Sequence, residues 1–324
     1  MRTLTIALAA LAAIVIGLFA FTHFAPERAT AILVNLDRTR SGLTRKQIDL
    51  PNGLRYVYLE GGQGEPLMLL HGFGADKENF TRVARHLTPH YHVIVPDQIG
   101  FGESSHPQRG DYSPVTQANN LHGLALALGI KQLDLGGSSM GGQIALTYAS
   151  LYPTEVSSLW LLAPAGIWSA PPSELARSIL TGGKNNLMTK NEEEFAQLFK
   201  FVMNDPPYIP RFVKNVMAQE DIVNYDLHLR IFEQIKNDDT LEKRVAGLPT
   251  PTLIVWGEQD RALNIATAAV LHKLLPRSQV ITIPGVGHLP MIERDGQVAA
   301  DYIRFRNGVG KIDRRDAPHA PSTG

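Results

Sequence analysis

The sequence predicts an α/β fold: a mostly parallel sheet flanked by helices, with a helical cap insertion and an N-terminal transmembrane helix. From residue 45 onward, short apolar runs alternate with longer helical patterns, which is typical of parallel strands joined by helices. The interval between Pro164 and Pro251 breaks this alternation and has a helical pattern throughout. The first 25 residues are almost uncharged and strongly apolar.

Residues 3–25 contain no Lys, Arg, Asp or Glu, and about 20 apolar residues in a helix span a bilayer. One alternative is a cleavable signal peptide, which ends in a small-x-small site. The one convenient site, before Pro26, has His23 where a small residue is required. The other alternative is a buried core helix. We favour an uncleaved anchor over residues 1–25.

A juxtamembrane helix is expected over residues 26–44, because apolar side chains recur there at helical spacing. These side chains are Ala29, Ile32, Leu33 and Leu36. The alternative is a linker helix that packs on the following domain.

Composition excludes several classes of function. The chain of 324 residues has 31 basic and 31 acidic side chains, so it has no basic field for a nucleic-acid backbone, and no nucleic-acid partner is expected. It contains no cysteine, which excludes disulfides, thiolate metal sites and cysteine nucleophiles. We expect neither a cofactor nor a bound metal.

The α/β core is predicted over residues 45–166 and 246–310, and a disordered tail over 311–324. The strands are expected near residues 54–59, 67–70, 92–95, 132–136, 156–162, 252–255 and 279–283. The helices between them are expected near residues 77–87, 115–128, 141–151, 265–275 and 297–305. Residues 167–245 form the insertion, which we interpret as a cap over a substrate pocket because insertions on such scaffolds tend to carry function. Helical padding on the sheet is the alternative.

The motif at residues 137–141, Gly-Ser-Ser-Met-Gly, lies between a predicted strand and a predicted helix. A serine on such a sharp turn requires small residues two positions before and after it. Only Ser139 meets this requirement, because choosing Ser138 would place Met140 where a glycine is needed. The pattern therefore predicts Ser139 as a nucleophile.

A serine nucleophile needs a histidine base and an orienting carboxylate. His288 lies in a glycine-rich loop after the last predicted strand, where this fold places its base; the alternative is an ordinary surface histidine. Asp260 and Glu258 both follow the strand near 252–255, and we choose Asp260 because it lies in the turn that can reach the histidine. The segment after the preceding strand, residues 161–166, offers no acid.

Two further polar residues are interpreted as structural. They are His71, in the loop after the strand near 67–70, and Asp134, inside the strand before Ser139. The same loop predicts one half of an oxyanion hole, because a turn of this kind presents a backbone N–H toward the nucleophile. This assigns the backbone amides of Phe73 and Met140.

The chain resembles the α/β-hydrolase family from about residue 50 to 306. The motifs that carry the resemblance are HGFG at 71–74, DQIGFG at 97–102, GSSMGGQ at 137–143, PTLIVWGEQD at 251–260 and GVGH at 285–288. With its anchor and the segment 148–166, the chain is most similar to membrane-anchored lipases, phospholipases A and monoacylglycerol lipases. The family's catalytic serine, aspartate and histidine fall on Ser139, Asp260 and His288.

The resemblance implies a serine carboxylester hydrolase that cleaves acyl esters of membrane lipids through an acyl-enzyme on Ser139. The alternatives are a carbon–carbon bond hydrolase of the same fold and a non-catalytic receptor. Ser139 argues against relatives with an aspartate nucleophile. The expected partners are membrane lipids and a second copy bound through the anchor helix. Positive residues follow the anchor, against the usual bias, but long domains translocate regardless, and we expect a domain in the periplasm of a bacterium, held at the inner membrane.

Overall fold

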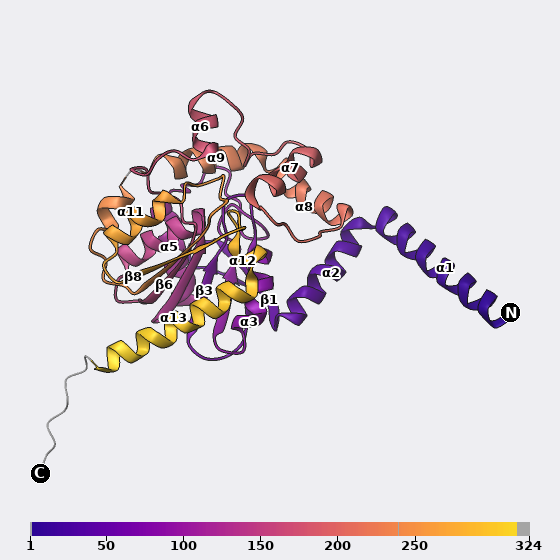
Figure 1. The fold of residues 1–324 in the computed structure, drawn as a ribbon, viewed down its shortest axis with the longest axis horizontal. Helices are drawn as coiled ribbons and strands as arrows, with labels where there is room; N and C mark the ends of the chain where they lie inside the picture. Colours follow the sequence, from indigo (N-terminus) through magenta and orange to yellow (C-terminus); the bar gives the residue numbers. More distant parts are fainter. Residues whose placement is uncertain (1, 239, 316–324) are drawn as a thin grey trace, which may run out of the picture.

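The computed structural model describes residues 2–238 and 240–315 and contains an eight-stranded sheet with helices on both faces (Figure 1). The strands lie in the order β1-β2-β4-β3-β5-β6-β7-β8, and all neighbours from β4 to β8 are parallel. The strands are β1 (Leu43–Asp49), β2 (Arg55–Gly61), β3 (Pro66–Leu70), β4 (His92–Pro96), β5 (Leu133–Ser138), β6 (Val156–Leu162), β7 (Thr252–Gly257) and β8 (Ser278–Ile283). The predicted α/β fold is confirmed.

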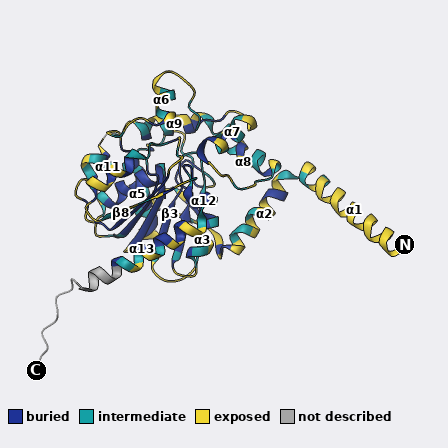
Figure 2. Cartoon of the chain, viewed as in Figure 1, coloured by how far each residue is buried: buried dark blue, intermediate teal, exposed yellow. Residues whose placement is uncertain are grey.

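Alternating side chains of the strands build two separate cores. In β3, Met68 and Leu70 pack on one face of the sheet, whereas Leu67 and Leu69 pack on the other, as the two-residue period of a strand requires. The sheet is buried throughout its centre (Figure 2). The first face is covered by α4 (Pro114–Ala127), α5 (Met140–Leu151) and α11 (Ala266–Leu274). The second face is covered by α3 (Thr81–Leu87), α12 (Pro290–Glu293) and α13 (Asp295–Arg315).

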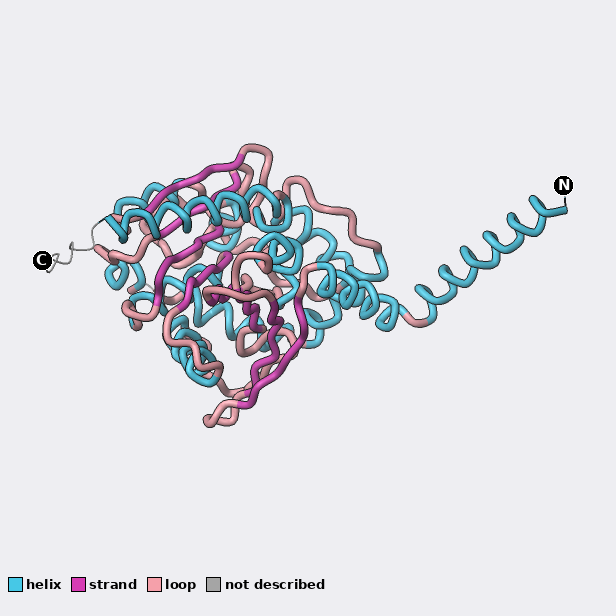
Figure 3. Tube along the Cα trace, turned by 90° about the horizontal axis from the view of Figure 1, so that it is seen from below, coloured by secondary structure: helices cyan, strands magenta, loops and turns pink. Residues whose placement is uncertain are grey.

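The N-terminal helix α1 (Arg2–Phe24) projects away from the rest of the protein (Figures 1 and 3). None of its residues is buried, which rules out the alternative of a buried core helix. It is long and apolar enough to cross a membrane. The chain breaks direction at Ala25, just before Pro26, and continues as α2 (Pro26–Arg40).

Helix α2 combines the two interpretations of the juxtamembrane segment. It packs against α3, β1 and α8 (Arg211–Val223), as a linker helix would. Its apolar stripe is divided, because Ala29 is buried against the domain whereas Ile32, Leu33 and Leu36 are exposed. The Arg38 guanidinium attaches the helix to the domain: its Nε lies 3.0 and 3.2 Å from the two carboxylate oxygens of Glu78.

The insertion between β6 and β7 is helical and lies along one side of the sheet (Figure 1). Its helices are α6 (Glu174–Leu180), α7 (Glu192–Val202), α8, α9 (Tyr225–Lys236) and α10 (Leu241–Val245). Phe201, Val202 and Met203 at the end of α7 form an apolar cluster with Ala262 and Leu289. The insertion therefore packs on the loops that follow β7 and β8.

Two segments differ from the sequence-based expectation. The strand β1 lies within and beyond the expected juxtamembrane helix 26–44; it is an edge strand with mostly exposed side chains, so no alternation of apolar residues marks it. At the other end, α13 continues to Arg315, whereas a tail was expected from residue 311. The rest of that tail, residues 316–324, lies outside the described residues.

A buried ion pair joins the centre of the sheet to α13. Both Asp134 carboxylate oxygens lie 2.8 Å from Nε of Arg306, and Ser158 Oγ donates to Asp134 at 2.9 Å. Burial raises the pKa of the Asp134 carboxyl above its usual value, although Arg306 opposes the shift. These contacts account for an acidic residue within a core strand and agree with its structural interpretation.

We expect Arg306→Met to lower the free energy of unfolding by about 3 kcal/mol, because it leaves the Asp134 carboxylate buried without its cation. Removal of the cation raises the pKa of Asp134 further, so the folded variant binds a proton at low pH and the loss should be larger at pH 8 than at pH 5. Urea unfolding at both pH values measures the effect. The control Arg304→Met, at a side chain that is 75% exposed, should change stability by less than about 0.5 kcal/mol. Equal effects of the two variants would contradict the role of the pair.

Candidate active site

Ser139 occupies a strained turn between β5 and α5. Its backbone has φ 53° and ψ −117°, and non-glycine residues rarely adopt a positive φ. A Cβ at Gly137 would lie 2.2 Å from the Gly141 carbonyl oxygen, and a Cβ at Gly141 would lie 2.1 Å from that of Leu70. Only glycine fits at either position. The turn therefore requires a glycine two residues before Ser139 and another two residues after it.

The Ser139 side chain is partly buried, and no hydrogen bond of its hydroxyl is found among the described residues. The loop after β3 runs beside it: a Cβ at Gly72 would lie 3.3 Å from Ser139 Cβ. Phe73 follows in that loop. Met140 is the first residue of α5, so its N–H has no acceptor within the helix. The two predicted oxyanion donors thus belong to the two segments that flank Ser139.

His71, at the start of the same loop, is fully buried and has both ring nitrogens engaged. Its Nδ1 lies 2.8 Å from the Gly72 carbonyl oxygen, and its Nε2 accepts the backbone N–H of Gln98 at 3.0 Å. Burial lowers the pKa of His71 to about 4, so the ring is neutral at neutral pH and carries its proton on Nδ1. This arrangement fits the predicted structural role and leaves no nitrogen free for proton transfer.

Asp260 and His288 form a buried pair on the loops that follow β7 and β8. Nδ1 of His288 lies 2.8 Å from Oδ2 of Asp260, and the two side chains are 4% and 0% exposed. The other carboxylate oxygen, Oδ1, accepts the backbone N–H groups of Ala262 and Leu263 at 2.8 and 2.9 Å. The carboxylate is thereby held by its own loop while it orients the ring, and Nε2 is left as the nitrogen able to accept a proton.

The rival acid Glu258 lies elsewhere. It is exposed, and its Oε1 lies 3.3 Å from the Thr282 hydroxyl oxygen. Since β5, β6, β7 and β8 are parallel neighbours, their carboxyl ends meet at one edge of the sheet. Ser139 follows β5 there, Asp260 follows β7 and His288 follows β8, so the fold brings the three predicted residues to the same edge.

The cap contributes residues that no sequence motif had indicated. His228 of α9 stacks on Phe101 with ring centroids 5.0 Å apart and meets the edge of Phe73 at 5.8 Å. Its Nδ1 lies 3.3 Å from a carboxylate oxygen of Asp221, whereas its buried Nε2 has no hydrogen-bond partner among the residues that the structure describes. A lone histidine within a long helical insertion gives no signal in the sequence, because only the tertiary fold carries it to the loop of Phe73.

Buried charges also support the loop at residues 97–102. Lys77 Nζ lies 2.7 Å from Asp97 and 2.8 Å from Glu103. Burial alone would lower the pKa of Lys77, but the carboxylates of Asp97 and Asp76 outweigh it and the pKa lies above its ordinary value.

Within the described ranges, no group of three or more His, Asp or Glu side chains has the arrangement of a metal site.

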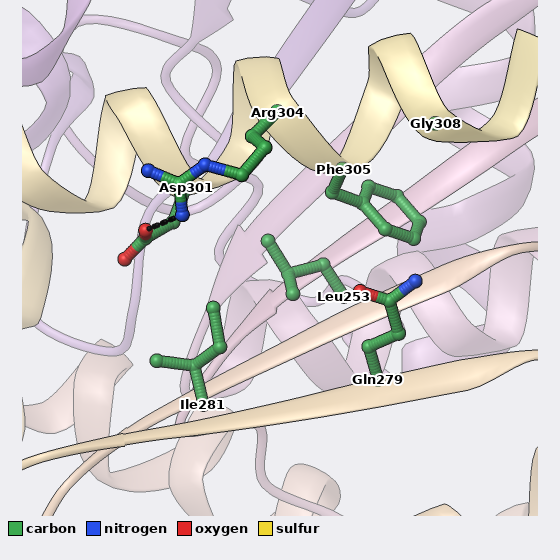
Figure 4. A pocket seen from close by; sticks show the side chains of 7 residues that line it. All are labelled: Leu253, Gln279, Ile281, Asp301, Arg304, Phe305 and Gly308. Atoms are coloured by element: carbon green, nitrogen blue, oxygen red, sulfur yellow. Dashed lines mark hydrogen bonds and ion pairs between the residues drawn. The ribbon is translucent and has the colours of Figure 1, made fainter.

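Two surface pockets lie outside this region. One, of about 120 Å³, is bordered by α13 and by Leu253 and Gln279 near the amino-terminal ends of β7 and β8 (Figure 4), the opposite ends from Asp260 and His288. The other, of about 210 Å³, lies between α7 and Arg261 on the surface of the cap. Neither pocket includes Ser139, Asp260 or His288.

Several known proteins are similar to this chain in sequence and in fold. The chain is 44% identical to Lipase 1 of Psychrobacter immobilis over 86% of this chain and 89% of that protein, and 28% identical to human monoacylglycerol lipase ABHD6 over 80% and 84%. The crystal structure of a membrane phospholipase A superimposes with a TM-score of 0.85 at 36% identity, covering 95% of this chain and 99% of the other. The family model described as the alpha/beta hydrolase fold matches residues 65–295. The chain therefore belongs to the α/β-hydrolase family.

Proposed function

We propose that this protein is a carboxylic ester hydrolase that cleaves acyl esters of membrane lipids with Ser139, Asp260 and His288. The observation that carries the proposal is the buried 2.8 Å contact between His288 Nδ1 and Asp260 Oδ2 at the sheet edge where the strained Ser139 turn also lies. The resemblance to Lipase 1, to ABHD6 and to the membrane phospholipase A supports a lipid ester as the substrate.

In the proposed reaction, Ser139 Oγ attacks the ester carbonyl carbon while His288 Nε2 takes the hydroxyl proton. Asp260 holds the ring and stabilises the imidazolium that forms. The backbone N–H groups of Phe73 and Met140 donate to the negative oxygen of the tetrahedral intermediate. The carbon–oxygen bond to the alcohol then breaks, and His288 returns the proton to the leaving oxygen. Water, deprotonated by the same histidine, then attacks the carbonyl carbon of the acyl-enzyme. The bond from this carbon to Ser139 Oγ breaks, His288 returns the proton to Oγ, and the carboxylic acid leaves.

We also propose that α1 is retained as an anchor and places the catalytic domain in the periplasm of a bacterium, at the inner membrane. The alignment with the membrane phospholipase A leaves out only 5% of this chain, which is shorter than α1, so the aligned region includes part of α1. A homodimer through α1 stays a prediction; the small residues Ala9, Ala13 and Gly17, spaced four apart, would allow close helix contact within the bilayer.

Ser139→Ala should fold normally and lose at least about 10⁴-fold in kcat on a soluble ester, because the attacking oxygen is removed. The neighbouring Ser138 provides a matched control, since its buried hydroxyl has no hydrogen-bond partner in the described part of the chain. Ser138→Ala should keep kcat within about threefold of the wild-type value. Labelling of the Ser139→Ala protein by a fluorophosphonate probe at the wild-type level would refute the assignment of the nucleophile.

A second experiment distinguishes the two carboxylates. Asp260→Asn should lower kcat by about 10³- to 10⁴-fold, because the amide no longer holds His288 in the tautomer that accepts a proton at Nε2. Glu258→Gln should have little effect, because this exposed side chain contacts Thr282 and not the histidine. Steady-state rates with both variants decide between them, and the reverse ranking would assign the orienting role to Glu258.

Deletion of residues 1–25 should release the protein from membranes and lower kcat/KM on phospholipid vesicles more than on a soluble short-chain ester. The truncated chain begins at α2 and keeps every strand. We expect it to fold, because α1 contributes no buried residue. An anchor holds enzyme and lipid on one surface and raises their effective concentration. Rates of full-length and truncated protein on the two substrates test this, and an equal loss on both would show that α1 does not direct substrate choice.

A further inference from the structure

Glu293, the last residue of α12, binds two segments of the chain at once. The side chain is buried, and its Oε1 accepts the backbone N–H of Gly287 at 2.8 Å. Its Oε2 accepts the backbone N–H groups of Asn204 and Asp205 at 2.9 and 2.7 Å. Gly287 directly precedes His288, whereas Asn204 and Asp205 follow the C-cap residue of α7, Met203, in the cap. One carboxylate therefore joins the histidine loop to the cap.

Further contacts join the same two segments. The backbone N–H of His288 donates to the Val202 carbonyl oxygen at 2.7 Å, and Asn204 Nδ2 donates to the Gly285 carbonyl oxygen at 3.1 Å. The fit is close: a Cβ at Gly287 would lie 2.8 Å from the Asn204 nitrogen. The peptide units on both sides of Gly287 are thus held by groups that lie outside their own loop.

These bonds bear on the geometry of the histidine. The ring of His288 is oriented at Nδ1 by Asp260, but the position of its Cα depends on the backbone bonds of Gly287 and His288. An ionised carboxylate has no donor and can accept all three N–H groups, and such charge-assisted bonds are stronger than neutral ones. A shift of about 1 Å in a catalytic group can cost about 10²-fold in rate.

We propose that Glu293 is a positioning residue that holds His288 in register with Asp260 and Ser139 by tying the histidine loop to residues 204–205 of the cap. The inference rests on the proposed role of His288 as the base. It also links two parts of the molecule: a cap that lifts at the end of α7 must either break the bonds of Glu293 or carry the histidine loop with it. The base is fully positioned only when this part of the cap is in place.

The test is Glu293→Gln, which preserves size but turns one acceptor into an N–H₂ donor that faces a backbone N–H. We expect kcat per active site on a soluble p-nitrophenyl ester to fall about 10- to 100-fold, with KM changed by less than about twofold. Titration with a fluorophosphonate probe counts the active sites, so a loss of folded protein does not enter the rate. The ascending limb of the kcat/KM profile should move to lower pH, because a looser contact with Asp260 favours the imidazolium less.

Glu194→Gln is the matched control. Its carboxylate also accepts a backbone N–H in the cap, that of Lys190 at 2.8 Å, but it makes no bond to the histidine loop. This variant should keep the wild-type kcat and pH profile. Hydrogen exchange gives a second readout: in Glu293→Gln, residues 202–205 and 285–289 should both lose protection, whereas Glu194→Gln should leave both unchanged. If Glu293→Gln does not accumulate in folded form, Glu293→Asp, one methylene shorter, is used for the same measurements with the same expectations.

An unchanged kcat per active site with an unchanged pH profile would overturn the proposal, and so would a loss of protection in only one of the two segments. A wild-type protein that the probe does not label would instead refute the proposed function, and this inference with it. The two failures are therefore distinguishable.

Discussion

The turn between β5 and α5 forces Ser139 into a backbone conformation, φ 53° and ψ −117°, that side chains seldom adopt. It persists because β5 is buried on both faces, α5 packs on the sheet, and glycines at 137 and 141 leave no side chain where neighbouring backbone already lies. The turn projects the Ser139 side chain from the edge of the sheet and places the first N–H of α5 beside it. The other elements of the site are arranged around this turn.

The other proposed catalytic residues, Asp260 and His288, lie on loops that contact each other. A Cβ at Gly257, where β7 ends, would lie 2.0 Å from the Gly287 carbonyl oxygen, so the loops of Asp260 and His288 are in direct contact. The cap contacts both loops, through the bonds of Glu293 to residues 204–205 and through the apolar cluster around Met203. The positions of Asp260, His288 and the cap therefore depend on one another through these contacts.

A chain of contacts also connects helix α2 to the loop beside Ser139. Arg38 of α2 binds Glu78, and the next residue back, Lys77, binds Asp97 at 2.7 Å. Gln98 then donates its backbone N–H to His71, whose neighbour Gly72 lies beside Ser139. Bonds between side chains and backbone thus lead from the juxtamembrane helix to the loop after β3. Burial in a low-dielectric interior makes each of these charges dependent on its partner.

The sequence by itself determined the fold class, the insertion, the apolar N-terminal helix and the family, because alternating periodicities and the motif around Ser139 are local properties of the chain. It also singled out Asp260 and His288 by their place in the order of strands, and the structure places His288 Nδ1 2.8 Å from Asp260 Oδ2. It did not reveal β1, whose exposed side chains carry no periodic pattern, nor the division of the α2 stripe between domain and solvent. Glu293 and His228 could be found only in the tertiary structure. The partners that link them to other elements lie far away in the chain, at residues 204–205 for Glu293 and at residue 101 for His228, and only the folded cap brings these residues together.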